Sequence, residues 1–293
     1  MKIVRIFGGL GNQMFQYALA VGLKHRQPDE DVFIDARCMN GYPLHNGFEL
    51  YRIFGVELPQ AGWRKLLRVG YPLPHYRLWQ IGRRLLPRRA TMVTETPEMD
   101  FVPELLTSPD DMLIEGYWQT ERYFADVSQA VSEAFTFPAF EPGSENENLA
   151  ERLKGCESVS LHIRRGDYMK IANASGICTR DYYRKALSEI HSRTNPELVA
   201  VFSDDPEWCR ANIRELTGDV PAVVVDCNSG ASSFRDMQLM SLCRHNVIAN
   251  SSFSWWGAWL NGNPDKIVAA PSRWMNGPGW PYILPQQWIA VTV

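Results

Sequence analysis

The chain has 293 residues, of which 45% are hydrophobic, 12% aromatic and 22% charged, a composition typical of packed globular proteins and not of disordered ones. Its 30 lysines and arginines face 33 aspartates and glutamates, and the net charge of −3 argues against a nucleic-acid binder. Six cysteines are thinly spread without a Cys-x-x-Cys pair, which favours a reducing compartment over a disulfide framework.

The first half of the chain opens with strands and helices in alternation. Apolar runs over 3–7 and 32–35 predict buried strands, and the pattern over 14–24 predicts a helix between them. After an irregular stretch, a strand is expected over 112–115 and a helix over 121–135.

A glycine-rich turn joins the first strand to the first helix. Its sequence, Gly8-Gly-Leu-Gly-Asn-Gln-Met14, resembles a dinucleotide-binding fingerprint, and Asp35 ends the next strand. However, the bulky Met14 stands where that fingerprint needs a third glycine for close packing of the helix. We therefore interpret the turn as a polar clamp, in which the amides of Asn12 and Gln13 meet a sugar or substrate hydroxyl.

A basic segment follows. Residues 58–94 contain eight lysines and arginines and no aspartate or glutamate. Basic amphipathic segments bind anionic membrane surfaces, so residues 64–89 are a candidate for peripheral membrane contact, with a solvated helical face as the alternative. Glycines and amides interrupt the uncharged stretch 6–23, so neither a signal peptide nor a membrane span is expected. The expected location is cytoplasmic, at most peripheral to the inner face of the membrane.

The second half alternates short apolar runs with helical patterns. Buried strands are expected over 159–163, 198–202, 222–225, 247–249 and 267–270. Helices are expected over 180–191, 206–216, 234–243 and 253–260. The alternation predicts an α/β fold with a parallel sheet covered on both faces. With a linker over 137–148, we expect two domains, 1–150 and 151–293.

Three of the strands in the second half end in groups that suit a phosphate or a nucleoside. In chain order they are Arg164 and Arg165, Asp204 and Asp205, and a helix start at Ser251, Ser252 and Phe253. Parallel strands bring their carboxyl ends to one edge, where arginines and helix N-termini hold phosphate and aspartate accepts from a base or ribose. Each group alone would also fit a structural role, as an ion pair that links two loops or as a helix cap. Together the three groups predict a nucleoside-diphosphate site.

Other features keep further interpretations open. His162, beside this site, suits a core residue and a functional one equally. The glycine turn with Asp35 would fit a nicotinamide-dependent oxidoreductase. Six of the ten tryptophans fall within 255–288, and indole faces that stack on sugars would fit a lectin-like glycan binder. The tripeptide Arg165-Gly-Asp167 of adhesion ligands directly follows a buried strand, which argues against that role.

Five motifs stand in order along the chain. They are Gly8-Gly-Leu-Gly-Asn-Gln-Met-Phe-Gln-Tyr-Ala18, Gly116-Tyr-Trp-Gln119, His162-Ile-Arg-Arg-Gly-Asp-Tyr168, Phe202-Ser-Asp-Asp205 and Asn250-Ser-Ser-Phe-Ser-Trp-Trp-Gly257. Together they resemble the α-1,2-fucosyltransferases of glycosyltransferase family 11, over nearly the whole chain. The arginine motif is specific to α-1,2-, α-1,6- and protein O-fucosyltransferases, and the opening motif narrows the resemblance further.

The resemblance implies a GT-B-like architecture, in which two Rossmann-type domains with parallel sheets face a cleft. It implies inverting transfer of L-fucose from GDP-β-L-fucose to the 2-hydroxyl of a terminal galactose in surface glycans. Domain 1–150 would take the galactose-terminated acceptor and domain 151–293 would bind the donor. Neither a metal nor another cofactor is expected.

Residue roles follow from the matching motifs. Arg164 matches the arginine that binds the donor diphosphate, and Asn12 matches a polar residue where acceptor and fucose join. Asp204 or Asp205 would meet the guanosine. The expected catalytic residues are Asn12, His162 and Arg164, and the expected donor-binding residues are Arg164, Arg165, Asp204, Asp205, Ser251, Ser252 and Phe253.

A general base is left open, with Asp35 and Glu49 as candidates by position. The run Asp29-Glu-Asp31 spells the Asp-x-Asp that many metal-dependent sugar transferases place after a strand, but here it precedes one. Arg164 and the helix N-terminus would instead stabilise the charge of the departing GDP. Loops within 36–120 would determine the specificity for the part of the acceptor beyond its terminal galactose.

Overall fold

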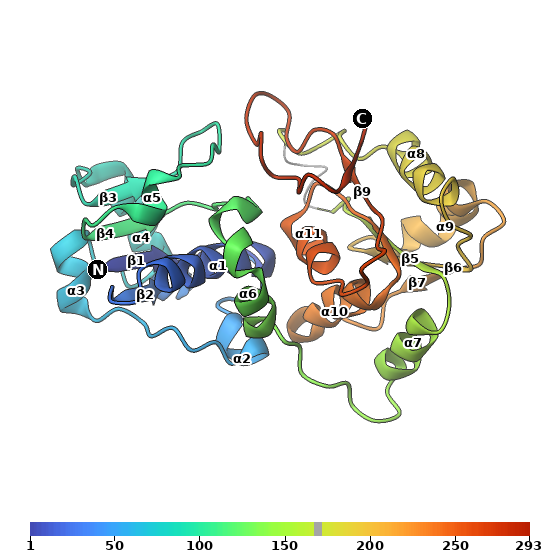
Figure 1. Cartoon of the computed structure of the whole chain (residues 1–293), viewed down its shortest axis with the longest axis horizontal. Helices are drawn as coiled ribbons and strands as arrows, with labels where there is room; N and C mark the ends of the chain where they lie inside the picture. The colour runs from blue at the N-terminus through green and yellow to red at the C-terminus, as the bar shows by residue number, and fades with distance from the viewer. Residues whose placement is uncertain (167–171) are drawn as a thin grey trace. The chain divides into compact units, whose positions relative to one another are not determined.

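The structure is a computed structural model that describes residues 1–166 and 172–293, and it divides the chain into two compact units (Figure 1). Unit 1 comprises Met1–Pro138 with Pro281–Ile283, and unit 2 comprises Ala139–Trp280 with Leu284–Val293. The division falls at Pro138 and not at 150, because helix α7 (Glu145–Lys154) packs its buried Ala150 and Leu153 into the core of unit 2.

Unit 1 is built on a four-stranded parallel sheet with the order β2-β1-β4-β3. Its strands are β1 (Lys2–Arg5), β2 (Val32–Asp35), β3 (Met92–Thr94) and β4 (Met112–Glu115). Because β1 pairs with β4, the carboxyl ends of these two strands are neighbours. The glycine turn follows one of them and the motif 116–119 follows the other.

Six short or medium helices surround this sheet. They are α1 (Leu10–Arg26), α2 (Leu50–Phe54), α3 (Trp63–Val69), α4 (Tyr76–Leu85), α5 (Glu104–Thr107) and α6 (Ser128–Ala134). Helix α1 begins earlier than expected, because the amides of Asn12 and Gln13 already donate to the carbonyl of Gly9 (2.9 and 3.1 Å). The helix expected over 121–135 is interrupted at Phe124, whose ring is fully buried and whose backbone is not helical.

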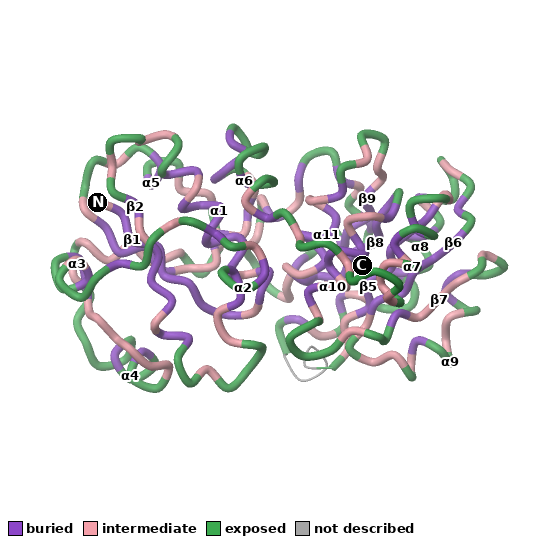
Figure 2. The backbone as a smooth tube through the Cα atoms, turned by 90° about the horizontal axis from the view of Figure 1, so that it is seen from below, coloured by how far each residue is buried: buried purple, intermediate pink, exposed green. Residues whose placement is uncertain are grey.

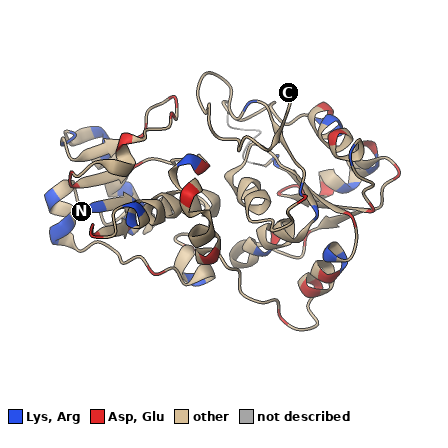
Figure 3. Cartoon of the chain, in the orientation of Figure 1, with Lys and Arg blue, Asp and Glu red and all other residues tan. Residues whose placement is uncertain are grey.

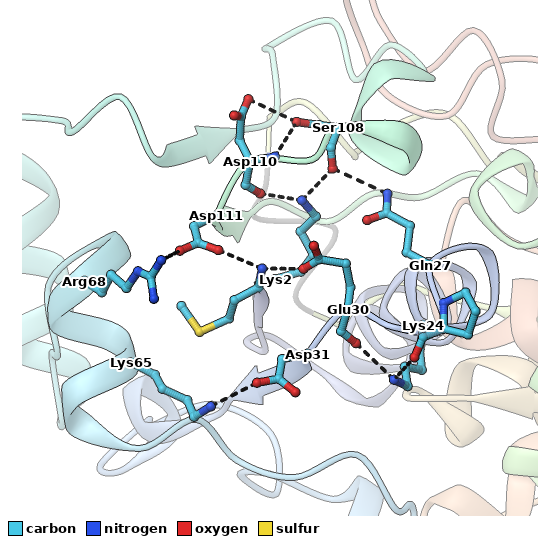
Figure 4. Close-up of polar contacts among 12 residues, drawn as sticks. Lys2, Lys24, Gln27, Glu30, Asp31, Lys65, Arg68, Ser108, Asp110 and Asp111 are labelled. Carbon is cyan, nitrogen blue, oxygen red and sulfur yellow. Dashed lines mark hydrogen bonds and ion pairs between the residues drawn. The ribbon is translucent and has the colours of Figure 1, made fainter.

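Ion pairs cluster at the amino edge of the unit 1 sheet (Figure 4). The terminal amine of Met1 lies 2.7 Å from Asp111 and also pairs with Glu30. Asp31 pairs with Lys65 at 3.2 Å. The Asp-x-Asp run 29–31 therefore lies at the edge opposite the strand carboxyl ends, and two of its acids are already neutralised by protein cations.

Unit 2 is a six-stranded parallel sheet with the order β10-β9-β8-β5-β6-β7. Its strands are β5 (Ser158–Ile163), β6 (Leu198–Ser203), β7 (Ala222–Val225), β8 (His245–Val247), β9 (Val268–Pro271) and β10 (Ile289–Val291). The chain runs outward from β5 to β7, then returns to β8 and runs outward on the other side. Its direction therefore reverses between β5 and β8, the place where such sheets bind ligands.

Helices cover both faces of the unit 2 sheet, as the sequence pattern predicts. They are α7, α8 (Arg180–His191), α9 (Pro206–Thr217), α10 (Phe234–Leu242) and α11 (Ser252–Trp259). Alternate strand residues serve the two faces: Val159 and Val201 pack with α8 and α9, whereas Ala200 and Phe202 pack with α7 and α10. Figure 2 colours the backbone by burial, and the central strands β5 and β6 are buried along nearly their whole length.

Candidate active site

The carboxyl edge of the unit 2 sheet gathers the three predicted polar groups. Strands β8, β5 and β6 are adjacent in this order, so the residues after Val247, Ile163 and Ser203 share one edge. The arginine motif and the serine-rich helix start flank the point between β5 and β8 where the chain direction reverses. This placement supports the predicted ligand site.

Asp204 holds the arginine loop after β5. One of its carboxylate oxygens, Oδ2, lies 3.1 Å from Nε of Arg164, and Oδ1 accepts from the backbone amide of Arg165 at 2.9 Å. A Cβ atom on Gly166 would stand 2.9 Å from Asp204 Oδ2, so a larger residue there would displace the Asp204 carboxylate or the loop. Asp167 and Tyr168 of the same motif lie outside the described residues.

Asp205 and Arg165 form a second, more structural pair. Nε of Arg165 lies 3.2 Å from Asp205 Oδ2, and its guanidinium carbon lies 4.1 Å from the ring centroid of Trp208. Asp205 Oδ1 also caps α9 by accepting from the amide of Trp208 at 3.1 Å. Both aspartates thus have protein partners, and these contacts favour a role in orienting the arginines over the predicted contact with guanosine.

His162 is a buried, neutral imidazole. Its side chain points from β5 into the unit, 4% exposed, with its ring centroid 6.1 Å from that of Phe253. Burial and the charge of Arg164 lower the pKa of His162 to about 3, so it carries no charge at neutral pH. Its Nδ1 atom has no hydrogen-bond partner among the described residues. His162 can therefore donate or accept a hydrogen bond but cannot contribute a positive charge.

The start of α11 presents backbone amides to the same edge. Ser251 is its N-cap residue, and the Ser251 side chain makes no capping hydrogen bond to the first turn, which contains Ser252 and Phe253. The buried Asn250 fixes this turn by donating to the carbonyls of Ala174 and Trp274 at 3.3 and 3.0 Å. Amides at a helix N-terminus favour an anion, which agrees with Arg164 in the loop after the adjacent strand β5.

Asp236, in the first turn of α10, is a further acid at the carboxyl side of this sheet. Its Oδ1 accepts from Nδ2 of Asn228 at 2.8 Å, and burial raises the pKa of Asp236 to about 7. No sequence pattern indicated Asp236, because a single aspartate early in a helix carries no signal beyond ordinary capping.

In unit 1, the glycine turn is stabilised by its own amides. Gln13 is fully buried, donates to the carbonyls of Gly8 and Gly47 (2.9 and 2.8 Å) and accepts from the amide of Glu49 at 3.0 Å. The expectation that Gln13 contacts a ligand is therefore wrong, since its hydrogen-bonding groups are used within the protein. Asn12 is half-buried, and its Oδ1 accepts from Nε2 of Gln119 at 2.6 Å.

Glu95 anchors the loop that carries Gln119. Its carboxylate accepts from the amides of Tyr117 and Trp118 at 2.6 and 2.8 Å, and Trp118 has a left-handed backbone, with φ of 55°. Burial raises the pKa of Glu95 to about 7. The motif 116–119 suggested this loop, but no pattern indicated the acid that holds it.

Neither predicted candidate for the general base is accessible. Asp35 is fully buried between Arg37, whose Nε lies 2.8 Å from Oδ1, and Arg5, at 3.3 Å from Oδ2. Glu49 is 2% exposed, and its Oε1 accepts from Arg52 at 2.6 Å and from Asn46 at 3.2 Å. Both carboxylates therefore stabilise the fold of unit 1 through their ion pairs.

The chain is similar to known glycosyltransferases. Residues 106–288 match the model of the family described as Glycosyl transferase family 11. The chain is 32% identical to the alpha-1,2-colitosyltransferase of Escherichia coli, covering 93% of this chain and 91% of that protein. It is 28% identical to the galactoside 2-alpha-L-fucosyltransferase Sec1 of Mus musculus, covering 95% of this chain and 69% of that protein.

A solved structure is similar in fold. The fucosyltransferase NodZ from Bradyrhizobium superposes with a TM-score of 0.50 and 18% sequence identity, covering 87% of this chain and 91% of that one. Together with the two parallel sheets, this likeness confirms the GT-B-like fold predicted from the sequence.

Proposed function

The chain belongs to glycosyl transferase family 11, and on this basis we propose that it transfers L-fucose from GDP-β-L-fucose to the 2-hydroxyl of a terminal galactose, with inversion. The observation that carries the proposal is the shared edge of β5 and β8, where Arg164 and the start of α11 suit a diphosphate. In this proposal unit 2 binds the donor and unit 1 takes the acceptor.

The residues at that edge divide the work as follows. Arg164 and the first amides of α11 stabilise the negative charge that grows on the departing GDP. Asp204 positions Arg164 through its Nε contact. His162 stays neutral and offers a hydrogen bond without adding charge.

The acceptor hydroxyl attacks from the face opposite to the leaving GDP, on a fucosyl centre with oxocarbenium character. The burial of Asp35 and Glu49 removes both from the role of general base. A cation-like transition state needs little base assistance, because bond breaking runs ahead of attack, and the hydroxyl proton passes to water as the new C–O bond forms.

A colitosyl donor is the second candidate, because a relative that this chain matches over 93% of its length is an alpha-1,2-colitosyltransferase. The deciding experiment measures GDP release from GDP-fucose and from the corresponding colitosyl donor, with a panel of galactosides, and identifies the new linkage by NMR. Release with GDP-fucose and galactosides, giving an α-1,2 product, supports the proposal. If GDP is released only from the colitosyl donor, the proposed donor GDP-fucose is replaced by the colitosyl donor.

The same assay separates the other classes of protein. A lectin-like protein would bind galactosides without releasing GDP, and a nicotinamide-dependent oxidoreductase would bind NAD in place of GDP. Trp255 and Trp256 are fully buried and pack edge to face at 5.0 Å, so they belong to the core and offer no surface for sugars.

We expect turnover to survive EDTA. Within residues 1–166 and 172–293, no group of three His, Cys, Asp or Glu side chains is arranged to hold a metal ion, and Arg164 with the helix amides supplies the positive charge. Activity is measured with GDP-fucose and lactose before and after chelation. Loss of activity that Mn²⁺ or Mg²⁺ restores would contradict the metal-free mechanism.

We also propose that residues 64–89 make a peripheral contact with an anionic membrane surface. Leu78, Ile81 and Leu85 lie on one face of α4 and are 50%, 53% and 77% exposed, and the same helix carries Arg77, Arg83 and Arg84. Figure 3 shows lysines and arginines on the helices of this part of unit 1. No helix in the described part of the chain is long and apolar enough to cross a membrane. Apolar side chains with basic neighbours suit the interface of an anionic bilayer.

The membrane contact is tested by sedimentation with vesicles. We expect binding to phosphatidylglycerol vesicles, weaker binding to phosphatidylcholine, and a loss of more than about tenfold in Ile81→Glu/Leu85→Glu, since two aliphatic anchors are removed. Leu44→Glu is the matched control, because Leu44 is 58% exposed outside this segment. Equal binding of both variants would overturn the proposal.

A further inference from the structure

Unit 1 contains a pocket of about 450 Å³ that the donor site does not use. It opens at the carboxyl side of the sheet, where Phe7 and Gly8 follow β1 and Tyr117 follows β4, and α4 forms one wall. Carboxyl edges of parallel sheets and pockets of this size are usual ligand sites.

One side of the pocket is aromatic. Phe7 packs against Trp79 and Tyr117 with ring centroids 5.2 and 5.1 Å apart, and Tyr42 meets Tyr76 edge to face at 4.7 Å. Burial raises the pKa of Tyr42 to about 12, so its hydroxyl stays a hydrogen-bond donor. Ring faces with hydroxyl groups at their edges match the mixed polar and apolar surface of a hexose.

The other side of the pocket is cationic. Arg83 lies 3.1 Å from Glu115 and is neutralised by it, although Glu115 is also paired with Arg5 at 2.7 Å. Arg84 and Arg88 line the pocket and form no ion pair with an acidic residue of the described chain. The pocket therefore holds more positive than negative charge, and arginine forks bind phosphate in bidentate geometry.

We propose that this pocket binds an acceptor saccharide that carries a phosphate or diphosphate, with the sugar on the aromatic side and the phosphate on Arg84 and Arg88. The inference rests on the proposed function only in that the saccharide is called an acceptor, because its binding to the pocket needs no donor. The phosphate has two possible sources, a free sugar phosphate and a lipid-linked sugar diphosphate. The exposed apolar face of α4 adjoins the pocket wall and suits the lipid-linked form.

The test compares lactose, lactose-1-phosphate and prenyl-diphosphate-linked lactose in neutral micelles. Calorimetry is run with saturating GDP, so that phosphate binding does not report on Arg164. We expect lactose-1-phosphate to bind at least tenfold more tightly than lactose. A further tenfold gain for the prenyl form assigns the lipid source, and an equal affinity assigns the free sugar phosphate.

The variants Arg84→Gln and Arg88→Gln should abolish the preference for phosphate while leaving GDP affinity and lactose affinity within twofold. Arg152→Gln is the matched control, because it removes the same charge from an exposed position of unit 2. Equal affinity of the wild type for lactose and lactose-1-phosphate overturns the inference, as does an unchanged preference in both variants. If the protein prefers lactose-1-phosphate but transfers no sugar, the proposed function is refuted and the inference about this pocket stands.

Discussion

Replacing Arg164 by lysine is expected to lower kcat on the order of 10²–10³-fold with GDP-fucose. Lysine keeps the positive charge but loses the planar fork, and with it the bidentate hold on a diphosphate. It also loses the Nε contact to Asp204, which positions the side chain. Steady-state kinetics with GDP-fucose and lactose measure the loss.

Arg165→Lys is the matched control. Arg165 stacks on Trp208 and pairs with Asp205, so lysine there should lower thermal stability with a smaller loss of turnover. The two variants thus separate a residue that meets the diphosphate from one that supports the loop. Near-normal kcat and KM for Arg164→Lys, or equal losses in both variants, would contradict the role of Arg164.

The second half of the fold could be predicted because its central strands, β5, β6, β8 and β9, are buried. Such strands appear as continuous apolar runs, and parallel connection through helices then places their carboxyl ends at one edge. Two elements of unit 2 escaped this reasoning. Helix α7 is largely polar and buries only Ala150 and Leu153, and β10 is a three-residue strand without a long apolar run.

The first half was harder to predict, for a physical reason. Helices α2, α3 and α5 have between four and seven residues, which is too short for a helical period to emerge. These helices are fixed by tertiary packing, as where Leu66 and Val69 of α3 pack against Leu113 of β4. The loops and the pocket that they build could not be derived from the sequence.

At the candidate site, the sequence indicated which residues come together but not how they pair. The edge shared by β5, β6 and β8 follows from topology alone. The division of Asp204 and Asp205 between two arginines depends on side-chain directions that adjacent positions do not reveal. The same holds for Gln13 and Asn12, of which only Asn12 remains partly exposed.

Asn12→Ala is expected to lower turnover by about tenfold or more while leaving GDP affinity within twofold. In the proposed division of labour, Asn12 acts on the acceptor side and contributes in the transition state more than in the ground state. Arg164→Ala should show the reverse, with a loss of GDP binding itself. Calorimetry with GDP, run beside turnover with GDP-fucose and lactose, measures both quantities for each variant.

Gln119→Ala is the control that tests whether Asn12 acts directly. Asn12 Oδ1 accepts from Gln119 Nε2 at 2.6 Å, so a purely structural role would make the two alanine variants equally slow. A larger loss for Asn12→Ala assigns it a contact with the reacting sugars. If Asn12→Ala instead abolishes GDP binding and Arg164→Ala preserves it, the nucleotide binds at the glycine turn of unit 1. The start of α1, with its amides bonded to the carbonyl of Gly9, would then have to open to admit a phosphate.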